Sequence, residues 1–198
     1  MRRVLIVLLS ITAAWAVDKK GGFAPAPADS YPGHVTADKI TIAAKPYNTA
    51  ELAATAFGKV KPHERGILPV LVVIRNNTGK ALRLDLKTEF VTADGQHLEA
   101  ISPDDVIRYQ GIQRRPGTKS SAPRIPGINS GAPKGPLNTP EIEGRAFLVK
   151  LLPPGESANG FFYFEASELK GAQLYLTGIK DAASNQSYFY YELPLDAR

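Results

Sequence analysis

Apolar and polar residues alternate along much of the chain with a period of two, which is typical of strands with one buried face. Leu82, Leu84 and Leu86 alternate with charged residues and Phe90 keeps the same phase, which predicts a strand from 82 to about 92. Residues 39–42 show the same alternation, so we expect ordered structure to begin at Asp38.

Residues 67–74 break this pattern because they are almost all apolar apart from Pro69. A short run rich in valine, leucine and isoleucine is typical of a strand covered on both faces. Residues 76–80 follow with the sequence Asn-Asn-Thr-Gly-Lys, which favours a turn. We therefore expect 67–74 to be the central strand of the sheet.

One segment has the period of a helix. Asn48 and Glu51 resemble a capping box, residues 52–57 contain an apolar face, and Gly58 is placed to end the helix. The sequence Ser102-Pro103-Asp104-Asp105 is likewise expected to cap a turn or a single helical turn before Val106 and Ile107.

Four further strands are predicted after residue 140, at 146–152, 160–164, 173–179 and 188–193. The total is about seven strands with one short helix, and strands do not alternate regularly with helices. The pattern predicts an all-β fold, an antiparallel β-sandwich.

The first sixteen residues are typical of a secretory signal peptide. Arg2 and Arg3 precede the apolar run 4–11, and Ala14-Trp15-Ala16 supplies small residues at the expected cleavage site. The apolar stretch is shorter than the ~20 residues that span a bilayer, which favours cleavage over an uncleaved anchor. We expect an exported protein, periplasmic or secreted, with no transmembrane segment in its mature form.

Residues 17–37 are rich in Gly, Pro and Ala and are predicted to be a flexible tether, so the β-sandwich domain is expected to span 38–198. The chain has no cysteine, so no disulfide can contribute to its stability. The chain that remains after removal of the signal peptide is long enough for apolar packing to stabilise one ordinary domain.

The charge of the chain is unevenly distributed. Residues 110–140 form a predicted long loop rich in Pro and Gly, whose charged residues are all basic. Those basic residues are Arg114, Arg115, Lys119, Arg124 and Lys134. The loop is either a solvated linker or a binding element for an anionic polymer, such as a wall polysaccharide, lipid headgroups or nucleic acid without sequence specificity.

Aromatic residues cluster in two late strands, at 161–164 and 188–191. Half of them are expected in the core, while Tyr163, Tyr188 and Tyr190 are predicted to form an exposed stripe that binds a sugar or a protein.

Two stretches carry a resemblance to a known family: LPVLVVIRNNTGKALRLDLKTEFVTADG, and later LLPPGESANGFFYFE. Together they resemble the immunoglobulin-like domains of unknown function in exported bacterial proteins. The resemblance covers roughly residues 38–195, and the loop 110–140 lies outside the usual pattern. It implies an immunoglobulin-like fold with a binding, adhesion or assembly role, and it offers no family active site to transfer to these residues.

The sequence shows no recognisable catalytic motif. Ser157 lies outside a G-x-S-x-G pattern, and His63-Glu64 lacks the second histidine of a helical zinc motif. We therefore predict no metal, no cofactor and a non-enzymatic binding or accessory role in the cell envelope, with an anionic polymer or a protein as partner. The alternative is an enzyme with dispersed residues such as His97, Asp104 and Asp105 that meet in the fold.

Overall fold

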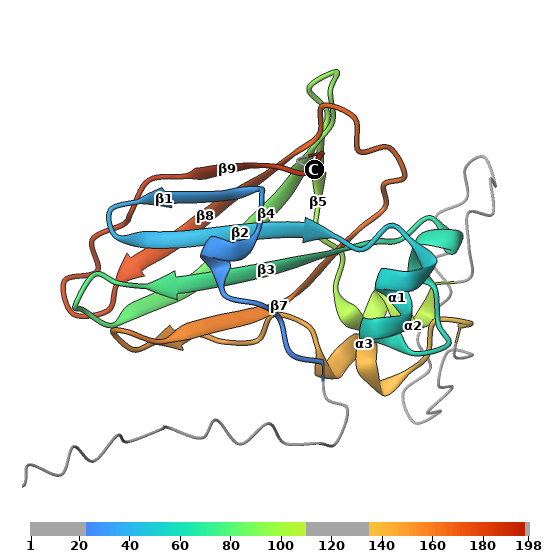
Figure 1. Ribbon diagram of the computed structural model, residues 1–198, viewed down its shortest axis with the longest axis horizontal. Coiled ribbons are helices and arrows are strands. Elements are labelled where there is room, and N and C mark those ends of the chain that lie inside the picture. The colour runs from blue at the N-terminus through green and yellow to red at the C-terminus, as the bar shows by residue number, and fades with distance from the viewer. Residues whose placement is uncertain (1–22, 110–134, 197–198) are drawn as a thin grey trace, which may run out of the picture.

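The computed structural model describes residues 23–109 and 135–196 (Figure 1). Within them the chain forms nine strands in two antiparallel sheets, together with three short α-helices. The sequence-based expectation of a β-rich, antiparallel fold is confirmed.

The first sheet has the strand order β1-β2-β3-β7. Its strands are β1 (His34–Ala37), β2 (Ile40–Pro46), β3 (Leu68–Asn76) and β7 (Ser157–Phe164). The second sheet has the order β5-β4-β8-β9, with β6 also paired to β4. Its strands are β4 (Leu82–Val91), β5 (His97–Glu99), β6 (Leu151–Leu152), β8 (Gln173–Asp181) and β9 (Tyr191–Pro194).

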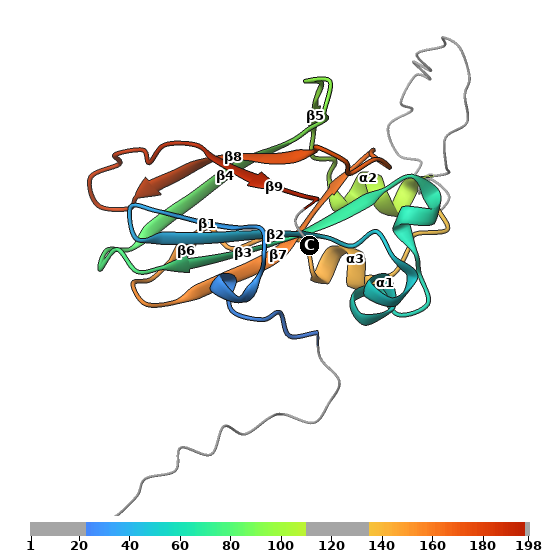
Figure 2. The same ribbon diagram turned by 45° about the horizontal axis from the view of Figure 1, so that its top comes forward.

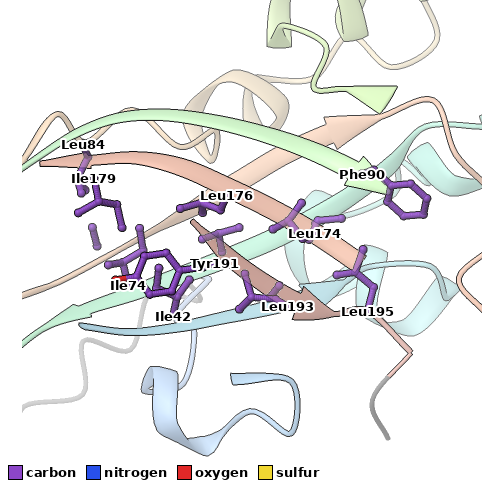
Figure 3. Close-up of a cluster of buried hydrophobic side chains, with 14 of the residues drawn as sticks. Ile42, Ile74, Leu84, Phe90, Leu174, Leu176, Ile179, Tyr191, Leu193 and Leu195 are labelled. Carbon is purple, nitrogen blue, oxygen red and sulfur yellow. The ribbon is translucent and has the colours of Figure 1, made fainter. Parts of the chain in front are cut away.

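Buried residues of both sheets form one hydrophobic cluster. Figure 3 shows Ile42 and Ile74 of the first sheet directed toward Leu176 and Tyr191 of the second. Every inward position of β4 named in the sequence analysis except the half-buried Leu86 is fully buried. The alternation in the sequence therefore identifies the face of β4 that packs in this core.

Strand β3 is buried on both faces, as its apolar sequence predicts. Val70 and Val72 belong to the cluster between the sheets, whereas Leu71 and Val73 belong to a second cluster on the opposite face. That second cluster joins the first sheet to the helices. The first sheet is thus covered on both sides along β3.

The helices gather at one end of the sheets, which we call the helical end (Figures 1 and 2). It consists of α1 (Ala50–Phe57), α2 (Pro103–Arg108), α3 (Pro140–Gly144) and the 3-10 turn Pro62–Arg65. Helix α1 packs on β7, where the ring centroids of Phe57 and Phe161 are 4.9 Å apart.

Both predicted helix caps lie close to their expected positions. Thr49, not Asn48, caps α1 by accepting a hydrogen bond from the Leu52 amide at 3.3 Å, and Gly58 ends the helix. In α2 the Ser102 hydroxyl accepts a hydrogen bond from the Asp105 amide at 3.1 Å, as predicted.

The N-terminal segment differs from the expected tether. Phe23 packs on Phe161, Ala28 and Tyr31 are buried, and residues 34–37 form β1 against β2. The Gly/Pro/Ala composition concealed this order because the apolar contacts are few, widely spaced and without a period. Residues 1–22 lie outside the described part of the chain.

Three boundaries predicted around the long loop and its following strands also differ. The described fold resumes at Gly135: residues 135–139 have turn or irregular backbone but are packed, since Leu137 is buried, and α3 begins at Pro140. Residues 146–152 form an isolated bridge from Ala146 to Phe161 and then the two-residue β6, because the chain here passes from one sheet to the other. Strand β9 begins at Tyr191, later than predicted.

A glycine is required at one irregular point of the second sheet. The register between β4 and β8 shifts between Leu84 and Lys87, and Gly178 opposite this shift has a φ of +90°. A Cβ at this position would lie 2.0 Å from the Asp85 carbonyl oxygen. Only glycine combines that backbone conformation with so close an approach.

No α-helix in the described ranges is long and apolar enough to cross a membrane.

Candidate anion-binding site at the helical end

A pocket of about 300 Å³ at the helical end is lined mainly by basic and apolar residues, and we call it the root pocket. Its lining residues are Lys59, Val60, Lys61, Glu64, Arg65, Pro136 and Leu137. Gly58 ends α1, so Lys59 and Lys61 fall in the exposed connection between α1 and the 3-10 turn Pro62–Arg65. Three cations thus share one small surface hollow.

The charges of the root pocket are only partly balanced. The Lys61 ammonium lies 2.9 Å from the Glu64 carboxylate, and its hydrogen bond is the main cause of a lowered Glu64 pKa. Among the described residues, no carboxylate lies within ion-pair distance of Lys59 or Arg65. These two cations are available to an external anion.

The root pocket lies where the basic segment 110–134 rejoins the fold. The Gly135 amide donates a hydrogen bond to the Ile107 carbonyl at 2.8 Å, so the chain leaves and re-enters at adjacent points. A Cβ on Gly135 would lie 2.5 Å from the Tyr109 carbonyl oxygen, which shows how closely the two ends are packed. Leu137, which also lines the root pocket, is buried in the second hydrophobic cluster, the one that joins the first sheet to the helices.

Charge is separated between the fold and this segment. The described residues contain 14 lysines and arginines and 18 aspartates and glutamates, whereas residues 110–134 contain five basic residues and no acidic one. Acidic residues occur at the helical end as well, on α2 and α3: Asp104, Asp105, Glu141 and Glu143. A local positive excess is found in the root pocket, which has three cations and one carboxylate, and in the sequence of the neighbouring segment 110–134.

The five basic residues predicted to bind an anion lie outside the described residues. They are Arg114, Arg115, Lys119, Arg124 and Lys134. The root pocket adds Lys59, Lys61 and Arg65, which the sequence analysis missed. A signal was present, because residues 59–65 carry three cations in seven positions.

The predicted tyrosine stripe needs correction. Tyr163 is buried, its hydroxyl donates to the Ile142 carbonyl at 2.8 Å, and burial raises its pKa. Tyr188 is half-buried against the core between the sheets. Tyr190 is 55% exposed and stacks on Tyr175, with 5.1 Å between ring centroids. Tyr190 is therefore an exposed aromatic residue stacked on the half-buried Tyr175, and Tyr163 belongs to no exposed stripe.

Two of the three residues considered for a dispersed enzyme site, His97 and Asp105, have separate local partners. His97 Nδ1 lies 2.6 Å from the Glu89 carboxylate at the β4–β5 pairing. Asp105 accepts a hydrogen bond from Ser102 at 2.7 Å, and Asp104 is exposed in the first turn of α2. Within the described ranges, no group of three or more His, Asp or Glu side chains is arranged to hold a metal ion.

No family model matches the sequence, and a search of curated proteins gives no match.

Proposed function

We propose that the protein is an exported, non-enzymatic binding domain that attaches to an anionic polymer of the cell envelope through its helical end. Its fold is, in this proposal, an immunoglobulin-like β-sandwich. The shared hydrophobic cluster between two antiparallel sheets supports that architecture.

The observation that carries the proposal is the position of the root pocket. Lys59 and Arg65 have no carboxylate partner in the described part of the chain. Leu137, which lines the same pocket, lies three residues after the end of the basic segment 110–134. Eight cations, three in the pocket and five in the segment 110–134, are thereby linked to one end of the molecule.

Charge separation favours a polymer over a single small anion. Several cations that each contact one charge of a polyanion gain from counterion release, and the binding then weakens as salt rises. The acidic excess of the described fold opposes broad contact with the same polymer. Binding is therefore expected to be confined to the helical end.

The test uses the exported protein, purified from cells that express the full chain, and beads that carry polyphosphate as a defined polyanion. The variant Lys59→Gln/Lys61→Gln/Arg65→Gln removes the cations of the root pocket. Its matched control, Lys39→Gln/Lys87→Gln/Lys150→Gln, removes three exposed lysines elsewhere: one in a turn, one in β4 and one in the irregular segment before β6.

We expect the root-pocket variant to bind at least about tenfold more weakly at low salt and to show a smaller salt dependence, while the control changes little. Equal losses in both variants would show that only net charge matters. That result would contradict a site at the helical end.

A further inference from the structure

A second cavity lies away from the root pocket, along the line where the two sheets meet edge to edge. Strands β1 and β9 are the outer strands of their sheets and lie side by side there (Figure 1). A hollow of about 610 Å³ and an adjoining one of about 250 Å³ share Lys45, Pro46 and Leu195. We call the continuous hollow the seam groove.

The wall of the seam groove combines apolar side chains with two cations. Leu52 of α1, Leu169 and Leu195 supply apolar surface in the larger part, whereas Tyr31 and Pro32 do so in the smaller part. Leu195 is almost fully buried and belongs to the cluster between the sheets. The groove therefore reaches the margin of the main hydrophobic core.

Both lysines of the seam groove are free to meet an anion. Among the described residues, no carboxylate lies within ion-pair distance of Lys45 or Lys170. The Lys45 ammonium lies 5.9 Å from the centroid of the Tyr31 ring, which holds it at the junction of the two hollows. The one acidic residue of the wall, Asp196, accepts a hydrogen bond from the Gly171 amide at 2.9 Å.

The backbone around the groove disfavours an added strand. Pro32, Pro46 and Pro194 line it, and proline has no amide hydrogen to donate to an incoming strand. Recognition must therefore depend on charge and apolar contact. An occupant with an anionic group and an apolar chain satisfies both.

We propose that the seam groove binds a single-chain amphiphile with an anionic head, such as a long-chain carboxylate. The head lies between Lys45 and Lys170, and the chain lies along Leu52, Leu169 and Leu195. The volume of the larger hollow falls within the range of small-molecule sites, about 300–1,000 Å³. This proposal is independent of polymer binding at the helical end.

The test is titration calorimetry of the exported protein with dodecanoate, dodecyl phosphate, dodecyltrimethylammonium and butanoate, each below its micelle concentration. We expect dodecanoate and dodecyl phosphate to bind, and the cationic amphiphile and the short acid to bind at least about tenfold more weakly. Tighter binding of dodecanoate would indicate a fatty-acid-like ligand, whereas tighter binding of dodecyl phosphate would indicate a ligand with a phosphate headgroup.

Two variants locate the site. Lys45→Gln/Lys170→Gln should weaken dodecanoate binding at least about tenfold, whereas Lys39→Gln/Lys150→Gln, which removes two lysines outside the groove, should leave it unchanged. A thermal unfolding curve of each variant separates lost binding from lost folding.

The proposal is overturned if the cationic amphiphile binds as well as dodecanoate, or if the two double variants behave alike. Polyphosphate binding, measured in parallel, should be insensitive to Lys45→Gln/Lys170→Gln. The two proposals can therefore fail separately.

Discussion

At the scale of single residues, the end of the sheets opposite the helices depends on two buried polar side chains. Asn76 donates to the carbonyls of Lys80, Leu152 and Pro153, and it accepts hydrogen bonds from the amide and hydroxyl of Thr78. Asp181 binds the Lys80 ammonium at 2.9 Å and accepts from the amides of Ala183 and Ser184. In the sequence, Asn76 indicated only a turn.

Replacement of Asn76 should be costly because the amide connects three stretches of backbone. Asn76→Ala leaves the buried Leu152 carbonyl without this donor, and we expect a loss of about 2–4 kcal/mol in the free energy of unfolding. Urea unfolding monitored by tyrosine fluorescence measures it. The exposed neighbour provides the control, since Asn77→Ala should change stability by less than about 1 kcal/mol.

Asp181 predicts a pH dependence of stability. The Lys80 hydrogen bond, followed by the two backbone amides, lowers the pKa of Asp181 to about 2 from 3.8. Because the folded-state pKa is lowered, this carboxylate stabilises the fold above about pH 4, and the contribution is lost as the pH falls toward 2.

The isosteric variant Asp181→Asn tests whether the Asp181 carboxylate causes this pH dependence of stability. It should be less stable than the parent protein at pH 7, and the difference should shrink as urea unfolding is repeated at pH 4, 3 and 2.5. A difference that stays constant over this range would assign the effect to packing.

At the scale of elements, the sequence predicts best where one face of a strand is buried. The alternation of β4 and the apolar run of β3 correctly indicated their burial. Strand β7 is different because the second cluster covers Phe161 and Tyr163 while the core between the sheets covers Phe164. When both faces of a strand are buried, the alternation of residues along it cannot identify an exposed face. For this reason Tyr163 was wrongly predicted to be exposed. Strands of two to four residues, such as β1 and β6, are too short to show a period.

Gly160 of β7 tests how closely the segment after α3 packs on this strand. A Cβ here would lie 2.4 Å from the Phe147 Cα, so Gly160→Ala must displace backbone. We expect a loss of about 1–3 kcal/mol in unfolding free energy. Gly144→Ala, where a Cβ meets nothing within 4 Å, should be neutral or slightly stabilising. Similar losses for both variants would contradict the close approach.

At the scale of the whole molecule, the two sheets share a core and the helices occupy one end, with the basic segment attached there. The cations of that segment were evident from the sequence because composition alone identifies them. The root pocket was evident only in part, since its three cations lie close together in the sequence at 59–65 but Leu137 joins them only after chain folding. The seam groove depends in the same way on Lys45 and Lys170, which are far apart in the sequence.

The proposed attachment to an anionic envelope polymer is tested most directly by co-sedimentation with isolated envelope fractions, over a range of salt concentrations, of the protein purified from cells that express the full chain. The test variant has Gln in place of Arg114, Arg115, Lys119, Arg124 and Lys134. These substitutions change none of the residues that the structure describes. We predict that the parent protein sediments with the envelope at low salt, is released as salt rises, and that the variant remains in the supernatant. Salt-independent sedimentation of both proteins, or the absence of sedimentation for both, would contradict the claim.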